Sequence, residues 1–506
     1  MTTGSFFVRR LTSNWGAIAV LALATALLAG CAPGASGSRS AAGEVTVALG
    51  ASPASLDYTR NAGAAIPQAL LYNVYETLVK IDQDGAVKPL LARSWTVSPD
   101  RRVYTFELQP GVRFSNGEPM TAENVKFSLD RLGEWTTPPA AQLAGIAETT
   151  VLGPTSVRIT LEQPDNALLT SLAGPAGTIF TPAGIETLAS SPIGTGPYQV
   201  ESYDRGVRMR LVARDGYWGA APPARRLTLV YYSDPTAQTN ALLTGGADAA
   251  LGVTSPQVLP MFRDNPEFRV TSGTTTGEMM LPMNCAVAPF NDIRVRQAVR
   301  YAVNTAAVRE IAAEGYGEDI TTMVPPSDPW FEAGPGPYPY DPERARALLD
   351  EAGVIGTTVT FKVPNMPQYV RAAQAVQSDL DRVGLHTDLQ ILEFPAVWLG
   401  EVITSKNFQL AIINHAEPRD ITKFSDPKFY LGYHNPAADA VLASARSGPP
   451  EDYVPMMREY ARMISEDAPA DFLFLVPWIN VVSARVSGEP TDLVSESIDL
   501  TRIQRS

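Results

Sequence analysis

Alternating apolar and polar side chains predict strands at several points along the chain. Between residues 103 and 108, apolar and polar side chains alternate, a period that is typical of a strand with one buried face. Residues 45–49 and 157–161 follow the same period, so we expect two further strands there. Residues 410–413 are all apolar and predict one fully buried strand.

Apolar side chains that recur every three or four residues predict helices behind suitable capping residues. Thr121, Asp292 and Asp341 each precede such a pattern, and their side-chain oxygens can accept a hydrogen bond from the first turn. A fourth amphipathic pattern covers residues 369–383 and ends at Gly384, a residue type that favours the left-handed backbone of a helix end. Because strands and helices alternate in this half of the chain, we expect an α/β lobe there.

The length and charge of the chain narrow the choice of fold and partners. A chain of 506 residues is too long for one hydrophobic core, so we expect two or three lobes. Its net charge of −13 argues against nucleic acid as a partner, because phosphates attract a basic surface. The two cysteines, Cys31 and Cys285, exclude a disulfide framework and a four-thiolate zinc site.

Motifs of common catalytic and nucleotide sites do not occur in this sequence. There is no G-x-S-x-G, no H-E-x-x-H and no G-x-x-x-x-G-K-S/T pattern. Arg294, Arg296 and Arg300 fall within one predicted helix, where they form either a phosphate-binding patch or a solvated face. We expect no enzyme activity, no cofactor and no metal site.

The N-terminal residues have the composition of a secretory signal. Arg9 and Arg10 precede an apolar run over residues 15–28, and small residues follow it, which predicts a signal peptide over residues 1–30. This run is shorter than the roughly 20 residues that span a bilayer. Residues 31–43 are rich in Gly, Ser and Ala and predict a flexible tether. No later segment is long and apolar enough to span, so we expect partner proteins to carry out any transport.

Several motifs together identify a family. Residues 89–95 read P-L-L-A-R-S-W, residues 192–198 read P-I-G-T-G-P-Y, and residues 289–304 begin P-F-N-D-I-R-V-R-Q-A. With residues 104–129, 214–218, 341–353 and 435–439, this order of motifs resembles the extracytoplasmic solute-binding proteins of the peptide/nickel (family 5) ABC importers. Residues 28–31, L-A-G-C, resemble the bacterial lipobox, which implies lipidation at Cys31.

The resemblance implies an α/β fold with two lobes and mixed sheets, the periplasmic-binding-protein or Venus flytrap fold. Lobe I is expected over residues 44–275 with an inserted subdomain, lobe II over 276–471, and a C-terminal return to lobe I over 472–506. Residues 71–78, which contain Y-E-T-L, resemble a helix of the family. The expected partners are a small solute, a membrane permease and ATPase subunits. We expect a monomer that is lipid-anchored at the outer face of the cytoplasmic membrane.

The candidate ligand site follows the buried strand predicted at residues 410–413. Charged side chains at a strand end face a crevice more often than a core, because burial without a partner is unfavourable. In peptide-binding members of the family, an acidic residue after this strand pairs with the α-amino group of the peptide, whose backbone binds like an added strand. The candidates are Asn414, His415, Glu417, Arg419 and Asp420.

The roles of these residues leave several alternatives open. Glu417 and Asp420 are candidates for the α-amino group, and Arg419 for a carboxylate; alternatively, the three form a surface cluster that satisfies itself. His415 and Glu417 offer only two ligands for a metal chelate. We expect oligopeptide capture for ABC import. The alternatives are another solute, such as a nickel chelate, haem or a sugar, and a sensory lipoprotein that is not involved in uptake.

Overall fold

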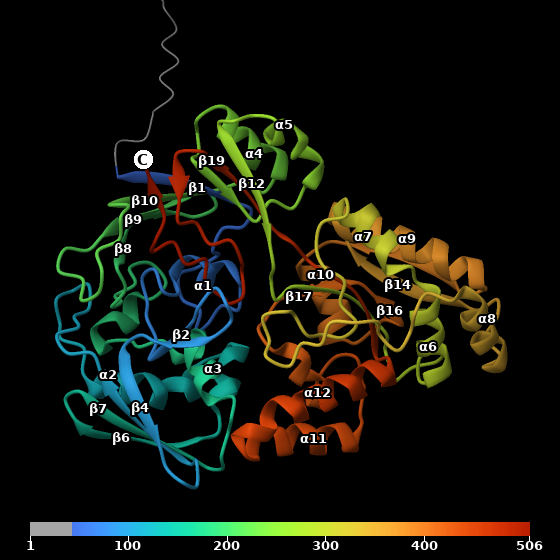
Figure 1. The fold of residues 1–506 in the computed structure, drawn as a ribbon, viewed down its shortest axis with the longest axis horizontal. Coiled ribbons are helices and arrows are strands. Elements are labelled where there is room, and N and C mark those ends of the chain that lie inside the picture. Colours follow the sequence, from blue (N-terminus) through green and yellow to red (C-terminus); the bar gives the residue numbers. More distant parts are fainter. Residues whose placement is uncertain (1–42) are drawn as a thin grey trace, which may run out of the picture. The chain divides into compact units, whose positions relative to one another are not determined.

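The structure is a computed structural model that describes residues 43–506 (Figure 1). The predicted signal peptide, the lipidation site Cys31 and nearly all of the tether lie outside the described residues. Within residues 43–506, no helix is long and apolar enough to cross a membrane.

Lobe I is built on a mixed seven-stranded sheet with the order β12-β19-β11-β1-β10-β9-β8. The central strand β1 is parallel to both β10 and β11, and the other pairs are antiparallel. The strands are β1 (Glu44–Leu49), β8 (Tyr198–Asp204), β9 (Arg208–Ala213), β10 (Arg226–Tyr231), β11 (Ala249–Leu251), β12 (Phe268–Gly273) and β19 (Trp478–Ser483). The associated helices are α1 (Ala65–Leu70), α4 (Pro235–Leu243) and α5 (Pro260–Arg263).

A second, antiparallel sheet of lobe I has the order β4-β5-β7-β6 and packs against α2. The two inner strands, β5 and β7, alternate buried side chains with partly or fully exposed ones, as the period of two predicts. The elements here are β2 (Val79–Ile81), β3 (Val87–Pro89), β4 (Ala92–Val97), β5 (Val103–Leu108), α2 (Ala122–Asp130), β6 (Ile146–Gly153), β7 (Ser156–Leu161) and α3 (Leu168–Ala173). Helix α3 packs against the β2–β3 hairpin, and its Thr170 contacts Arg419 of the second lobe.

Lobe II contains two three-stranded sheets, with the orders β17-β13-β18 and β15-β14-β16. The first is antiparallel and the second is parallel. The strands are β13 (Glu278–Pro282), β14 (Thr358–Pro364), β15 (His386–Leu392), β16 (Leu410–Ala411), β17 (Ile413–His415) and β18 (Ala470–Leu475). The helices are α6 (Ile293–Ala302), α7 (Thr305–Ala313), α8 (Pro342–Glu351), α9 (Pro367–Val383), α10 (Ala396–Trp398), α11 (Pro436–Ser447) and α12 (Pro450–Asp467).

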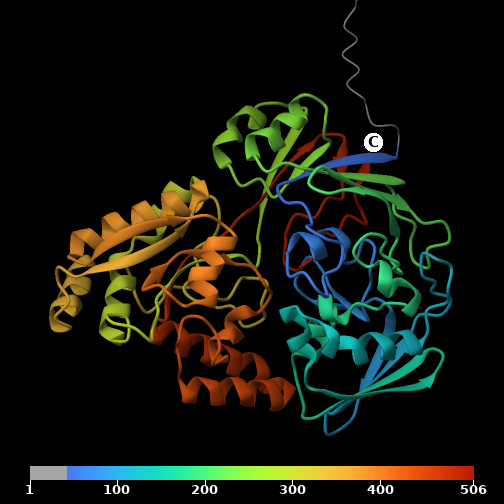
Figure 2. The same cartoon turned by 180° about the vertical axis from the view of Figure 1, so that it is seen from behind.

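The chain passes twice between the lobes. It leaves lobe I after β12 and enters lobe II at β13, and it returns between β18 and β19. The boundary predicted after residue 471 therefore falls inside β18. The C-terminal segment adds β20 (Val486–Ser487) and β21 (Gln504–Arg505), and both views show the C-terminus beside β1 (Figures 1 and 2).

Local capping signals in the sequence are confirmed. The side chains of the predicted caps Asp292 and Asp341 each accept a hydrogen bond from the first turn of the helix that follows. Helix α2 begins behind Thr121 as predicted, but there the backbone amide of Thr121 donates to the Asn124 side chain. Gly384 adopts a left-handed backbone, with φ +90°, at the end of α9. These helix starts and stops depend on neighbours a few residues away, which explains why the sequence alone predicts them.

Two predictions are wrong because tertiary contacts override the local pattern. Residues 71–78 are not helical: their backbone carbonyls at Asn73 and Val74 accept hydrogen bonds from the segment around Gly196. In α6, Arg296 and Arg300 are buried rather than part of a solvated face or phosphate patch. They donate to backbone carbonyls, and Arg300 also pairs with the buried carboxylate of Asp471 at 3.2 Å.

Candidate functional site

The predicted strand at residues 410–413 is in fact two strands in different sheets. β16 pairs with β14, whereas β17 pairs with β13, so the chain changes sheet at Ile412. In this register His415 lies opposite Glu278 on the neighbouring strand. The change of sheet therefore brings a histidine at the end of β17 beside a carboxylate that is distant in sequence.

Three candidate ligand atoms lie close together at the end of β17 and in the segment that follows it. A left-handed Arg419, with φ +60°, turns the chain into a short helix that begins at Asp420. As a result, the nearest side-chain ligand atoms of His415, Glu417 and Asp420 all lie within 4.8 Å of one another. The ammonium of Lys423 lies 2.9 Å from Glu417 Oε2 and 4.0 Å from Asp420 Oδ2. Four of the charged or ligating groups thus converge on one small region.

Burial dominates the electrostatics of this region. It raises the pKa of Asp420 well above its usual value, although the positive charge of Lys423 opposes the shift. It lowers the pKa of His415 to about 4, so the imidazole is neutral at pH 7. Burial also raises the pKa of Glu278, and the negative charge of Asp420 adds to the effect. These shifts mark a place where charge is unfavourable without a bound partner.

Arg419 connects the region to both lobes. Its Nε lies 3.6 Å from Oδ1 of the buried Asp328, and its guanidinium stacks 4.9 Å from the ring centroid of Trp330. The same guanidinium donates a hydrogen bond to Thr170 on α3 of lobe I. Thr276 in the crossover donates to the carbonyl of Ala416 at 2.8 Å. The site therefore lies where the lobes meet.

The C-terminal segment brings one more carboxylate to this region from the lobe I side. The amide of Ile498 in that segment donates to the carbonyl of Gln68 in lobe I. Glu496 lies against Gly174, which follows α3, and interacts electrostatically with Glu417 and Lys423. Burial and the charge of Glu417 raise the pKa of Glu496 to about 7.

The charged groups of this region are called the interlobe cluster below. Its members are Glu278, Asp328, Glu417, Arg419, Asp420, Lys423 and Glu496. Of the sequence candidates, Glu417, Arg419 and Asp420 belong to it, His415 lies beside it, and Asn414 is on β17 with an amide oxygen that is buried. Sequence reasoning missed Glu278, Asp328, Lys423 and Glu496. Of these four, only Glu278 could have been proposed from the sequence, because it is an acidic residue at the start of an apolar run.

A separate set of contacts joins the lobes away from this cluster. Asn166 of lobe I donates through its side chain to the carbonyls of Ala445 and Gly448 at 2.8 and 3.0 Å, at the end of α11. Arg446 donates to Asp165 at 3.1 Å. Arg101 also donates to the carbonyl of Gly448. We call these contacts the interlobe latch.

Residues 86–434 match the family model described as "Bacterial extracellular solute-binding proteins, family 5 Middle". The chain belongs to this family. It is 31% identical to the glutathione-binding protein GsiB of Escherichia coli strain K12 over 389 residues, which cover 74% of this chain and 73% of the relative. Family 5 proteins are extracytoplasmic solute-binding proteins rather than enzymes, and they work with ABC permeases.

Solved structures confirm the two-lobed periplasmic-binding-protein fold. DppA from Helicobacter pylori in complex with the peptide STSA has a TM-score of 0.80 at 22% identity, covering 91% of this chain and 98% of that chain. NikZ from Campylobacter jejuni in complex with Ni(L-His) has a TM-score of 0.79 at 20% identity, covering 92% of this chain and all of the other. At these identities the likeness shows the fold alone.

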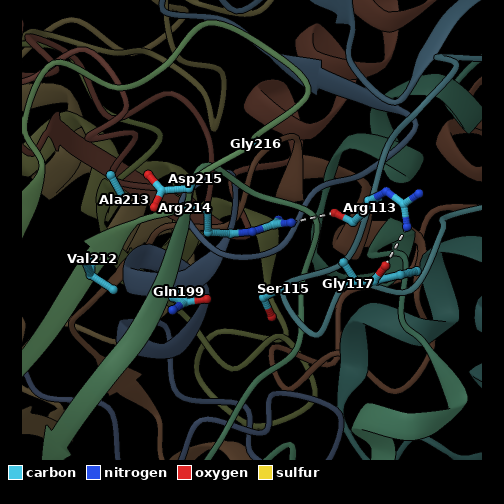
Figure 3. Close-up of a pocket in the computed structure, with 10 residues that line it drawn as sticks. Arg113, Ser115, Gly117, Gln199, Val212, Ala213, Arg214, Asp215 and Gly216 are labelled. Carbon is cyan, nitrogen blue, oxygen red and sulfur yellow. Dashed lines mark hydrogen bonds between the residues drawn. The ribbon is translucent and has the colours of Figure 1, made fainter.

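A hollow of about 460 Å³ lies elsewhere on this family 5 chain, between β8, β9 and the loop after β5 (Figure 3). Its arginines bind the protein itself. Arg214 donates to the carbonyls of Arg113, Gly194 and Gly196, and Arg113 donates to the carbonyl of Gly117. Because both guanidinium groups form hydrogen bonds within lobe I, we attribute the hollow to the packing of lobe I and not to a ligand.

Proposed function

We propose that this protein captures small peptides at the interlobe cluster and delivers them to an ABC permease. The proposal rests on the surroundings of the Asp420 carboxylate. Its side chain is 3% exposed, yet neither carboxylate oxygen accepts a hydrogen bond from another described residue. Buried carboxylates normally have such partners, so a ligand cation is the missing partner that best fits this position.

The α-amino group of a peptide supplies that cation. β17 is an edge strand of its sheet, with β13 on one side only, and the backbone of an edge strand can pair with an added strand. Arg419 is the candidate for a peptide carboxylate, because a guanidinium binds carboxylates in bidentate fashion. The relatives support this choice: one is named for glutathione and one is bound to the peptide STSA.

Closure of the lobes follows from the same arrangement. A ligand held between Asp420 on lobe II and the α3 side of lobe I binds the closed form more tightly than the open form, which shifts the equilibrium towards closure. The interlobe latch then holds the closed form that the permease recognises. Lipidation at Cys31 anchors the protein at the membrane, and cytoplasmic ATPases drive import.

A thermal unfolding screen tests the proposal. We expect di- to octapeptides to raise the melting temperature, because a ligand at about 100 times its Kd adds about 2.7 kcal/mol to the free energy of unfolding. The double variant Glu417→Ala/Asp420→Ala is expected to lose this shift. The control Glu401→Gln changes a lobe II carboxylate that pairs with Lys362 and keeps the shift. An unchanged peptide affinity in the double variant contradicts the site assignment.

A nickel–histidine chelate is the second candidate solute. The three ligand atoms of His415, Glu417 and Asp420 within 4.8 Å favour it, since a neutral imidazole and carboxylates are suitable metal ligands. We expect this alternative to hold if nickel with histidine raises the melting temperature, peptides do not, and His415→Ala abolishes the shift. A protein that reports its ligand to a membrane receptor instead would leave peptide uptake intact when its gene is deleted.

A further inference from the structure

The interlobe cluster holds more acidic than basic side chains. It contains five carboxylates, those of Glu278, Asp328, Glu417, Asp420 and Glu496. Among residues 43–506, two side-chain cations face them: Lys423 lies 2.9 Å from Glu417, and Arg419 lies 3.6 Å from Asp328. His415 is neutral because burial lowers its pKa to about 4. Two cations against five carboxylates leave an excess of three acidic groups.

The excess acidic groups are buried and lack hydrogen-bond partners. Glu278 is 1% exposed and Asp328 is 8% exposed. Glu278 Oε2, Asp328 Oδ2 and both oxygens of Asp420 accept no hydrogen bond among residues 43–506. If the ligand had a single ammonium group and it bound Asp420, Glu278 Oε2 would still lack a hydrogen-bond donor. Because Glu278 and Asp420 interact electrostatically, a second cation of the same small ligand can reach it.

The protein itself shows that an ammonium fits this environment. The Lys423 side chain is only about one-third exposed, and its ammonium lies between the carboxylates of Glu417 and Asp420. Burial disfavours its charged form, yet the charges of Asp420 and Glu417 raise its pKa. The local field therefore stabilises a buried ammonium.

We propose that the interlobe cluster selects solutes with two cationic groups and a net positive charge, which among peptides means a basic side chain near the amino terminus. This inference rests on the proposed peptide capture and names its substrate class. One cation binds at Asp420 and the second at Glu278. A bound cation stabilises the ionised form of the cluster's carboxyl groups. These negative charges then repel a carboxylate of the ligand, which disfavours acidic solutes.

Isothermal titration calorimetry with three dipeptides tests the inference. We expect Lys-Ala to bind at least ten times more tightly than Ala-Ala, and Glu-Ala to bind more weakly than either. Glu278→Gln, which keeps the shape of the side chain, is expected to reduce the Lys-Ala to Ala-Ala affinity ratio at least threefold. The control Glu401→Gln keeps the ratio. Equal affinities for Lys-Ala and Ala-Ala overturn the inference and leave peptide capture standing.

A probe without a peptide bond separates the two proposals. If no dipeptide binds but 1,5-diaminopentane binds, and Glu278→Gln weakens it, peptide capture fails and the preference for dications stands. If neither the dipeptides nor the diamine binds, both proposals fail. Asp328→Asn serves as a second variant if Glu278→Gln does not fold, which its unfolding curve shows. We expect it to lower the same ratio, and an unchanged ratio in a folded Asp328→Asn protein overturns the inference.

Discussion

Two buried carboxylates of this protein, Glu76 in lobe I and Asp420 in lobe II, differ in their partners. Glu76 is 1% exposed and Asp420 is 3% exposed, and burial raises the pKa of each, that of Glu76 to about 7. Glu76 accepts hydrogen bonds from the Tyr217 hydroxyl at 2.7 Å and from Trp218 Nε1 at 2.9 Å. Asp420 accepts none from another described residue. The two carboxylates are therefore equally buried, but only Glu76 accepts hydrogen bonds from neighbouring side chains, and this difference is why we propose Asp420 as the ligand site.

The comparison also explains the sequence motifs that identify the family. Glu76 belongs to one motif, Tyr217 and Trp218 to a second, and their neighbour Arg214 donates to Gly194 and Gly196 of a third. Segments far apart in sequence thus form one network that stabilises lobe I. These motifs stabilise the fold of lobe I, whereas the interlobe cluster, which we propose as the ligand site, lies outside them.

The largest expected effect is the loss of stability in Glu76→Ala. Removing this carboxylate leaves Tyr217 and Trp218 without their hydrogen-bond acceptor and Arg214 without a nearby negative charge, so we expect the free energy of unfolding to fall by about 3 kcal/mol. Urea unfolding measures it. Glu134→Ala removes an exposed glutamate that pairs with Arg131 and serves as the control, with an expected change below about 0.5 kcal/mol. A loss as small as that of the control would mean that the network does not stabilise lobe I.

The matching change at the other site, Asp420→Asn, is expected to act on binding instead. Asn keeps the shape but removes the negative charge, so peptide affinity should fall about 100-fold, or about 2.7 kcal/mol. Calorimetry measures the affinity, and urea unfolding checks that stability stays within about 1 kcal/mol of the wild type. A loss of stability equal to that of Glu76→Ala would remove the distinction between the two carboxylates.

The raised pKa of Glu76 predicts a dependence of stability on pH. Because its pKa is about 7 in the folded protein and near 4.3 in unfolded chains, the folded state binds more protons between these values. Its stabilising contribution is complete below the unfolded pKa and is lost as the pH rises through about 7. We expect a slope of at most about 1.4 kcal/mol per pH unit from this group, which Glu76→Gln removes. An unchanged slope in this variant argues against the shift.

The interlobe latch gives the smallest expected effect. Asn166→Ala removes two hydrogen bonds that exist only when the lobes meet, so we expect peptide affinity to fall about five-fold, or about 1 kcal/mol, chiefly through faster dissociation. Stopped-flow kinetics measures this rate. Gln163→Ala, an exposed change in the same segment, is the control. Equal dissociation rates in the two variants would show that the latch does not hold the closed form.

The sequence predicts what depends on near neighbours. The starts of α6 and α8 and the end of α9 follow from Asp292, Asp341 and Gly384, and the family motifs predict the two-lobed fold. The interlobe cluster depends on contacts between distant segments. The pairing of Glu278 with His415 and the approach of Glu496 to Glu417 are set by strand register and chain return, which no local pattern encodes.

Thermal unfolding with and without a tightly bound peptide tests the central claim most directly, in the wild type, Asp420→Asn and Glu76→Gln. We expect Asp420→Asn to melt near the wild-type temperature without peptide and to gain no stability from it. Glu76→Gln is predicted to melt at a lower temperature and to gain as much stability from the peptide as the wild type does. A full peptide-induced shift in Asp420→Asn would contradict the proposal that the Asp420 carboxylate binds the ligand.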